Sequence, residues 1–298
     1  RRHVEMVGEI LAKNTSQLLE LISPSSLSLN SQTDVIARLG PLVTRLARNT
    51  REVEAAQTIR FNVFVEEMQA KVPAEAMRLR RDIDMWDDVC DHLLVLDTSI
   101  EGDPEDQVVG TYRLLRQEVA KSAQGFYTSS EFDIEKLISR HPNKRFMELG
   151  RSCVLPNYRN KRTIELLWQG CWSYALTHKI DVMIGCASFS GVDPADHAQA
   201  LSFLHHNAKA DGEWVASPRP NLFQKMDLLD EAVIDAKAAI SEMPPLIKAY
   251  LRIGAKFGSG AVIDQAFNTT DVLVILPIDQ IDERYINYYS AGLARSAA

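Results

Sequence analysis

The 298-residue sequence predicts an α/β fold. An apolar strand pattern over 146–155 is followed by an amphipathic helix over 162–177 and a second strand over 180–188, which together form a β-α-β unit. Upstream, strand patterns over 92–97 and 107–116 enclose an acidic loop. Alternation of strands and helices of this kind is typical of a sheet covered by helices.

The first 50 residues have a different pattern. Residues 1–22 have helical spacing of apolar side chains, and 23–33 form a Ser- and Pro-containing linker. Residues 34–48 carry an apolar stripe flanked by arginines and interrupted by Pro41. Such a stripe suits a helix that packs on its own domain or one that lies on an anionic bilayer. The remaining expected elements are helices over 53–68, 131–139, 195–206, 230–240 and 245–255 and a strand near 271–276.

Charge and cysteine content limit the possible functions. A net charge of −7 argues against nucleic-acid binding. The four cysteines form no C-x-x-C pair, which indicates reduced thiols in a cytoplasmic protein and neither a disulfide framework nor a metal site. No run reaches the ~18 apolar residues of a membrane helix. The chain begins with Arg1, so a targeting segment upstream stays open.

Glu148 is the most informative residue, because it lies inside an apolar strand. A buried carboxylate is costly unless it has a partner or a task. Arg151 is the nearest cation in sequence, and strand alternation places the two side chains on opposite faces unless Gly150 marks a bulge. Two interpretations stay open, a structural ion pair and a catalytic carboxylate.

A basic turn, Pro156-Asn-Tyr-Arg159-Asn-Lys-Arg162-Thr163, joins this strand to the next helix. Free backbone N–H groups and positive charge at a helix N-terminus form a natural seat for a phosphate group.

An acidic strand followed by such a turn resembles the Gcn5-related N-acyltransferases, which hold a pantetheine thioester beside a general base. The resemblance implies a mixed central sheet flanked by helices. In that family the turn reads Arg/Gln-x-x-Gly-x-Gly/Ala, whereas this chain has bulky Arg162 and Ile164. Because small residues let the backbone close on a pyrophosphate, their absence argues against coenzyme A and favours the single phosphate of acyl carrier protein's phosphopantetheine.

Further motifs narrow the resemblance. The order of Arg60–Phe64, Asp82–Asp87, Val109–Leu115 and Glu148–Arg151 is similar to that in acyl-homoserine-lactone synthases. Additional blocks resemble the ornithine lipid synthesis N-acyltransferases, L-ornithine Nα-acyltransferases that use 3-hydroxyacyl carrier protein. These blocks are Gly185–Pro194, Leu204–His206, Pro244–Ala255 and Phe267–Val272.

The resemblance covers about residues 52–290 and implies an acyltransferase domain over 51–298, with an insertion near 207–241. Residues 1–50 then form an N-terminal helical extension. This extension is a candidate for contact with the anionic inner surface of the cytoplasmic membrane.

Within this domain we expect Glu148 to be the general base, assisted by Arg151. An ordinary glutamate pKa of about 4.3 is low for this task, so burial must raise it or an ordered water must relay the proton. Arg60, Arg113 and Arg151 can grip the amino acid's carboxylate. Asp84 and Asp87 can hold the δ-ammonium of ornithine. The alternative is that these charges form an internal ion-pair network.

The acyl donor is expected at the other end of the strand. A backbone N–H near Val154 and Leu155 can polarise the thioester carbonyl. Positions expected to bind the phosphopantetheine are Val154, Leu155, Arg159, Arg162 and Thr163. Lys248, Arg252 and Lys256 recur every four residues, which predicts one basic helix face. Such a face is either simply solvated or docks the acidic carrier protein.

Other chemistry-bearing residues have simpler interpretations. His205 and His206 end an apolar helix pattern, where a capping or core role is usual. The apolar neighbours of Cys153 and Cys186 favour inert thiols, and direct acyl transfer needs no covalent intermediate, bound cofactor or metal. Competing functions are a lactone synthase, an acetyl-CoA-dependent N-acetyltransferase and a scaffold that binds carrier protein or membrane without catalysis.

Overall fold

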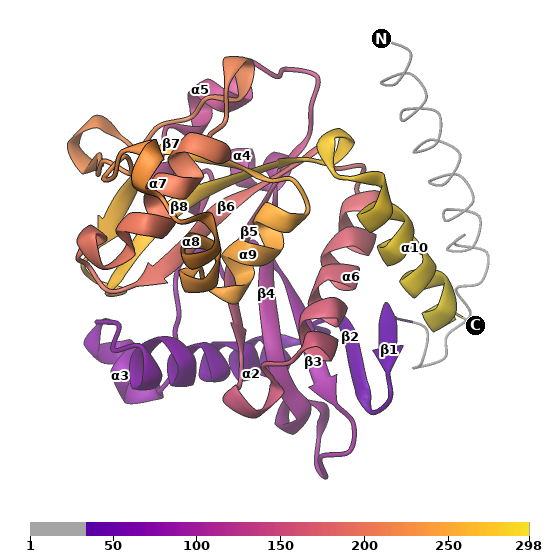
Figure 1. Ribbon diagram of the computed structural model, residues 1–298. Helices are drawn as coiled ribbons and strands as arrows, with labels where there is room; N and C mark the ends of the chain where they lie inside the picture. Colours follow the sequence, from indigo (N-terminus) through magenta and orange to yellow (C-terminus); the bar gives the residue numbers. More distant parts are fainter. Residues whose placement is uncertain (1–33, 298) are drawn as a thin grey trace.

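The computed structural model describes residues 34–297, which are built around one eight-stranded mixed sheet in the order β1-β2-β3-β4-β5-β6-β8-β7 (Figure 1). Only β5 and β6 pair in parallel, and all other neighbours are antiparallel. The strands are β1 (Ala37–Leu39), β2 (Leu42–Leu46), β3 (Asp91–Asp97), β4 (Val108–Arg116), β5 (Phe146–Val154), β6 (Val182–Ser190), β7 (Lys256–Asp264) and β8 (Thr269–Pro277).

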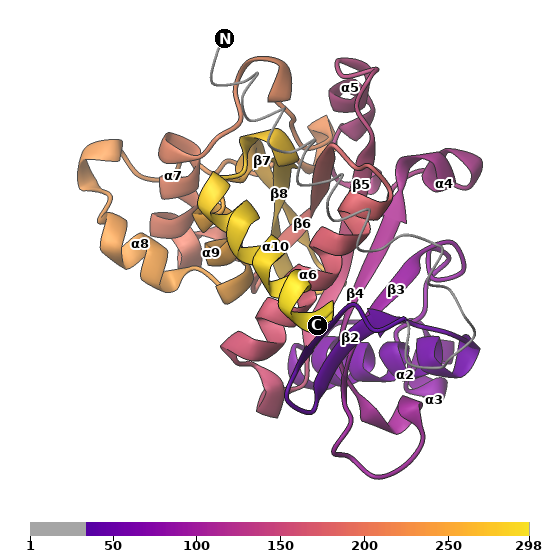
Figure 2. The ribbon, with the colours of Figure 1, turned by 90° about the vertical axis from the view of Figure 1, so that its right-hand side faces the viewer.

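Helices cover both faces of the sheet, and Figures 1 and 2 show them as separate layers. On one face α6, α7, α9 and α10 enclose the largest apolar core. On the other face α2 covers one end and α4 and α5 cover the middle. The helices are α2 (Thr50–Phe61), continued by a π-helix (Asn62–Glu67), α3 (Ala74–Leu79), α4 (Gln117–Ser122), α5 (Ile134–Ser139), α6 (Lys161–Thr177), α7 (Ala198–Asn207), α8 (Ala236–Glu242), α9 (Pro245–Arg252) and α10 (Glu283–Ala297).

The β-α-β unit predicted from the sequence is present as β5, α6 and β6. Asn160 caps α6 by accepting a hydrogen bond from the Thr163 N–H (3.2 Å), which satisfies one orphan donor of the first turn. Apolar residues on one side of α6, among them Leu166 and Cys171, are fully buried against the sheet. The helix packs closely because Gly170 lies against Leu93 of β3, where a Cβ would clash with the leucine side chain.

A bulge interrupts β5 where Gly150 suggested one. Thr111 of β4 pairs with Cys153 and Arg113 pairs with Gly150, so two residues of β5 face one residue of β4. Arg151 takes up the irregularity with a left-handed backbone (φ 51°). The bulge places the Arg151 side chain on the same face of the sheet as that of Glu148, whereas regular alternation would place the two on opposite faces.

The helix expected over 34–48 is wrong. These residues form the hairpin of β1 and β2, joined through Gly40 (φ 60°) and Pro41. Arg45, one of the arginines beside the apolar stripe, is buried and makes two 2.7 Å hydrogen bonds to Glu52 of α2. This part of the predicted N-terminal extension therefore belongs to the sheet. Residues 1–33, the rest of that extension, lie outside the described residues.

A long connection, residues 208–235, separates α7 from α8 and lies within the range 207–241 where the sequence predicts an insertion, while α8 occupies the end of that range. The connection contains short 3₁₀ helices and is tied to β7 through bridges at Lys209 and Gln224. Within residues 34–297 no helix is long and apolar enough to cross a membrane.

Candidate functional site

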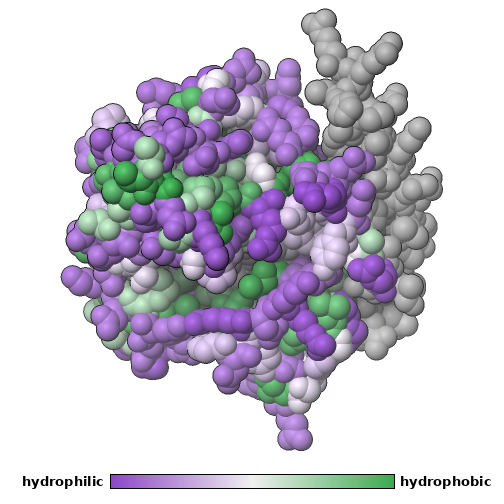
Figure 3. Space-filling model, viewed as in Figure 1, coloured by the Kyte–Doolittle hydropathy of each residue, from purple (hydrophilic) through white to green (hydrophobic). Residues whose placement is uncertain are grey.

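A cavity of about 520 Å³ opens through the sheet where β5 and β6 separate. The two strands pair only over Phe146–Glu148 and Val182–Ile184, although both continue well beyond this region. Because the strands then diverge, residues from both faces of the sheet line the same space. Figure 3 shows the opening as a hollow with an apolar floor, between the positions of α9 and α2 in Figure 1.

Glu148 lines this cavity and is almost fully buried. Its carboxylate accepts hydrogen bonds from the backbone N–H groups of Tyr127 (3.2 Å) and Thr128 (2.7 Å). Burial raises the pKa of Glu148 above its ordinary value, and the hydrogen bonds from Thr128 partly oppose this effect. A carboxylate that is buried, held in place and made more basic can act as a general base.

Three arginines and three aspartates beside Glu148 form a closed ring of alternating charge. Each arginine pairs with two aspartates and each aspartate with two arginines, so no charge in the ring lacks a partner. The ion pairs are Arg60–Asp82 (2.7 Å), Asp82–Arg151 (3.1 Å), Arg151–Asp84 (3.2 Å), Asp84–Arg113 (2.6 Å), Arg113–Asp87 (3.0 Å) and Asp87–Arg60 (2.7 Å).

The ring divides the residues that the sequence suggested for substrate binding. Arg60 and Asp87 are buried away from the cavity. Arg60 and Arg113 together hold the pKa of Asp87 well below its usual range, against the effect of burial. Neither residue lines the cavity, and Asp84 does not line it either. Arg113 and Arg151 do line it. The ring is thus the internal ion-pair network that the sequence left as an alternative, with two of its guanidinium groups facing the cavity.

Aromatic rings fix Arg151 from two sides. Its guanidinium carbon lies 4.8 Å from the ring centre of Tyr127 and 4.4 Å from that of Phe267. Such cation–π contacts stabilise a desolvated guanidinium. Tyr127 therefore contacts both Glu148, through its backbone, and Arg151, through its ring.

Only some of the residues expected to bind the acyl donor line the cavity. Val154 and Arg159 line the cavity, whereas Leu155, Arg162 and Thr163 do not. Arg159 is bound in a fork by Glu67 (2.5 and 2.6 Å). Arg162 is exposed, and Thr163 is fully buried under the Asn160 cap. Asn160 and Lys161 of the same turn line the cavity, which the sequence pattern did not single out.

The predicted basic row is interrupted. Lys248 and Arg252 lie on α9, but the helix ends at Arg252, and Gly254 (φ 97°) turns the chain into β7, which Lys256 begins. The prediction that Lys256 shares their helix face is therefore wrong, because a left-handed glycine ends the helical period.

Lys248 and Arg252 instead line a second cavity of about 640 Å³ between α6, α9 and α10. Lys161 and Arg284 add further positive charge, and Trp168 adds an aromatic wall. The second cavity shares Lys161, Ile164, Trp168 and Pro245 with the first, so the two adjoin at the start of α6 and α9.

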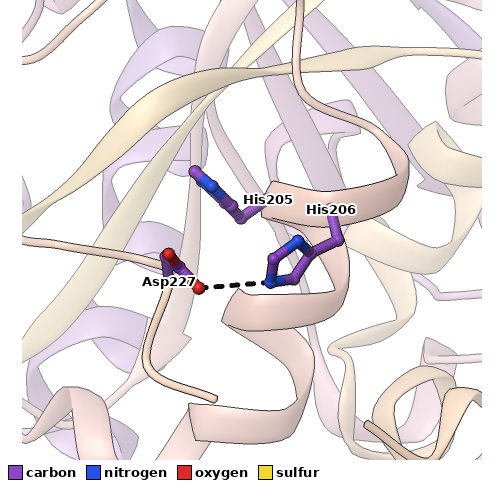
Figure 4. Close-up of side chains that lie close together, drawn as sticks. All are labelled: His205, His206 and Asp227. Carbon is purple, nitrogen blue, oxygen red and sulfur yellow. Dashed lines mark hydrogen bonds and ion pairs between the residues drawn. The ribbon is translucent and has the colours of Figure 1, made fainter. Parts of the chain in front are cut away.

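His206 has structural contacts, and the ring of His205 packs against that of His206. His206 at the end of α7 lies 3.1 Å from Asp227 on the facing connection, with His205 beside them (Figure 4). His206 also contacts the Leu229 carbonyl (3.3 Å), so the pair ties α7 to the connection that follows it. The cluster has the spacing of a cation site, as does a second one formed by Glu131, Asp264 and Asp271.

The cysteines fit the interpretation as inert thiols. Burial raises the pKa of Cys153 to about 12 and raises that of Cys186 well above its ordinary value. Both thiols stay protonated near neutral pH.

Comparison with known proteins identifies the family. Residues 59–169 match the model of the acetyltransferase (GNAT) domain. A protein of Agrobacterium fabrum named L-ornithine N(alpha)-acyltransferase is 61% identical over 290 residues, which cover 97% of this chain and 99% of that protein. The chain belongs to the L-ornithine N(alpha)-acyltransferase family. The Rhizobium meliloti member is 63% identical over 262 residues, 88% of each chain.

Family membership confirms the expected N-acyltransferase and its mixed α/β fold. Among solved structures, an N-acyl amino acid synthase from uncultured soil microbes aligns over 82% of this chain and 97% of its own, with 11% identity and a TM-score of 0.46.

Proposed function

We propose that the protein transfers a 3-hydroxy fatty acyl group from acyl carrier protein to the α-amino group of L-ornithine, giving lyso-ornithine lipid. The observation that carries this proposal is 61–63% identity to two L-ornithine N(alpha)-acyltransferases over most of the chain. The buried carboxylate at the separation of β5 and β6 supplies the chemistry such a reaction requires.

The reaction forms one bond and breaks one. The neutral α-amine attacks the thioester carbonyl carbon, the C–S bond breaks, and the thiolate leaves and takes up a proton. Glu148 removes the proton from the amine, directly or through a water, and the raised pKa suits it to this task. A backbone N–H of β5 near Val154, in the part of the strand that β6 no longer pairs, polarises the carbonyl. The Leu155 N–H is not available for this, because it donates to the Val109 carbonyl of β4 (2.9 Å).

The acceptor binds on the face of the sheet that carries Glu148. Arg113 and Arg151 hold its carboxylate at the cavity wall, while Arg60, Asp84 and Asp87 position these two guanidinium groups through the ring. This division of roles follows from which ring members line the cavity.

The donor enters from the α6 and α9 side. Arg159, Asn160 and Lys161 offer charge and polar groups for one phosphate at the start of α6, with Arg162 and Thr163 supporting the turn. Bulky side chains at Arg162 and Ile164 favour the single phosphate of a carrier-bound phosphopantetheine over a pyrophosphate.

Carrier docking is assigned to Lys248 and Arg252, together with Lys161 and Arg284 around the second cavity. Acidic carrier helices complement such a surface.

We also propose that the protein is cytoplasmic and contacts the anionic inner surface of the membrane peripherally, because a lipid product must reach the bilayer.

Product analysis tests the proposal. The purified protein is mixed with 3-hydroxyacyl carrier protein and a panel of amino acids, and products are identified by mass spectrometry. We expect 3-hydroxyacyl-ornithine, formed at least 10²-fold more slowly by Glu148→Gln, as for loss of a general base. Acylation of other amino acids without ornithine, or product formation at equal rates by the variant, contradicts the proposal.

A further inference from the structure

A second group of carboxylates, on β7, β8 and the segment before α5, faces the same cavity as Glu148. Asp271 and Asp264 line the cavity, and Glu131 lies beside Asp271. Asp271 is paired with Ser188 across β6 and β8, and Glu148 is paired with Ile184 across β5 and β6. Ile184 and Ser188 are four residues apart, so strand alternation places the two acids on one face of the sheet.

These carboxylates have no cation. Their oxygens lie within 4.8 Å of one another, and among residues 34–297 no Lys, Arg or His forms an ion pair with any of the three. Asp271 accepts a hydrogen bond from Ser188 (2.6 Å), and Asp264 accepts from backbone N–H groups. Several buried carboxylates close together are stable only if a cation binds to them or if they share protons.

The buried hydroxyl of Thr269 lies beside the same carboxylates, where it favours the ionised form of Asp271 and so opposes the burial that raises the pKa of this group. Thr269 is buried, lines the cavity beside Asp271, and has no hydrogen-bond partner of ordinary geometry among the described residues. A buried polar group that lacks a partner is unusual in a folded protein and indicates a ligand or solvent group that completes it.

Asp84 and Asp87, which the sequence suggests as partners of the δ-ammonium, cannot serve in this way. Asp84 and Asp87 each already pair with two arginines, and neither lines the cavity. An incoming ammonium would have to break an ion pair there. At Asp271 it would instead neutralise a charge that has no cationic partner among residues 34–297.

Two residues link Glu148 to the second group of carboxylates. Thr128 donates its backbone N–H to Glu148, its hydroxyl lies 3.9 Å from the Cys186 sulfur, and that sulfur lies 3.4 Å from Glu131. Two side chains thus separate Glu148 from the second group. Thr128 and Cys186 both line the cavity, so the path between the two groups runs along its wall.

We propose that Asp271, supported by Glu131, Asp264 and Thr269, binds the δ-ammonium of ornithine and so selects ornithine over amino acids with uncharged side chains. This inference rests on the proposed function. It also fixes the reacting group, because an amino acid held at its δ end presents its α-amine to Glu148.

Binding of the δ-ammonium should release a proton from the site, and this release can be measured. Burial and the neighbouring Asp271 raise the pKa of Glu131 to about 9, so one proton is held by the pair near neutral pH. An ammonium bound between them favours the ionised forms and displaces that proton. Norvaline (2-aminopentanoate) is ornithine without its δ-amine, and it leaves the proton in place.

The decisive experiment compares ornithine with norvaline. In Asp271→Asn the ratio of kcat/KM for ornithine to that for norvaline should fall about 10²-fold, the scale expected when a buried charge partner is lost. Asp279→Asn, a matched change at an exposed aspartate outside the cavity, should leave the ratio unchanged. An unchanged ratio in folded Asp271→Asn overturns the inference, as does a preference for ornithine that EDTA abolishes, which would indicate a metal ion.

Calorimetry on the unaltered protein covers the case in which Asp271→Asn does not fold. Titrations in buffers of different ionisation enthalpy should show proton release with ornithine and not with norvaline, and equal release with both contradicts the inference. The proposed function fails separately, when the unaltered protein forms no acyl-ornithine. Preferential ornithine binding coupled to proton release would still support the δ-ammonium site in that case.

Discussion

The backbone N–H of Thr128 donates a 2.7 Å hydrogen bond to the carboxylate of Glu148. This contact orients a buried acid toward the cavity without neutralising it by a direct ion pair. Burial then raises the pKa of Glu148, which a fully paired carboxylate would not allow.

Glu148 should therefore control the acidic limb of the pH profile. Because its pKa is raised, the ionised base accumulates only above the ordinary range near 4.5, and kcat/KM should rise with pH through a midpoint above that value. Glu148→Gln should lose that limb along with about 10² or more in kcat. Steady-state kinetics from pH 5 to 9 measures both effects. A variant that retains the same acidic limb would assign it to another group.

Arg60 should matter for stability, because it is buried and holds Asp82 and Asp87. Arg60→Ala leaves two buried aspartates with one partner each and should lower the free energy of unfolding by about 3–5 kcal/mol. Chemical denaturation measures the change. Arg78→Ala removes an exposed ion pair with Glu75 and serves as the control, with no measurable effect expected. Equal stability of the two variants would contradict the structural role of the ring.

Lys248 and Arg252 should determine the choice of donor. Their double reversal to Glu should slow acylation from carrier protein far more than from the matching acyl-CoA, since only the carrier brings an acidic surface. Lys237→Glu, an exposed change on α8, provides the control. The preference of the unaltered enzyme for carrier protein should shrink as salt rises. Equal kcat/KM for both donors at low salt, unaffected by the reversal, would exclude carrier docking at α9.

Glu131 should make stability fall as pH rises. The folded protein binds this proton more tightly than the unfolded chain, so the stabilisation is full below about pH 4.5 and is lost as pH approaches about 9. Glu131→Gln keeps a hydrogen-bond donor for Asp271 but cannot titrate. Its melting temperature should vary less with pH between 6 and 9. Parallel curves for the two proteins would show that Glu131 is ionised in both states.

Glu148 could be found from the sequence because an acid inside an apolar strand is locally conspicuous. The bulge was also predictable, since Gly150 interrupts the strand. The ring could not be derived, because Arg60, Asp82 and Arg151 are far apart in the chain and only the fold brings them together. Asp271 has a local signal, an acid next to the apolar run that begins at Val272, but its meaning depends on the partners across the sheet.

Two errors have local causes. The apolar spacing of 34–48 suits a helix, but the Gly40-Pro41 pair between two short apolar runs is a turn signal, and the chain forms a hairpin there. The four-residue spacing of Lys248 and Arg252 continues to Lys256, but the helix ends at Arg252, before Gly254. In both cases a turn residue outweighs periodicity.

The position of the acyl group on the product tests the central claim most directly. Tandem mass spectrometry of the product formed from 3-hydroxyacyl carrier protein and ornithine labelled with ¹⁵N at the α-amino group distinguishes acylation at Nα from acylation at Nδ. We predict that the acyl group is attached only to the labelled nitrogen. Acylation of the δ-nitrogen, or no ornithine product at all, would contradict an active site in which Glu148 receives the α-amine of ornithine.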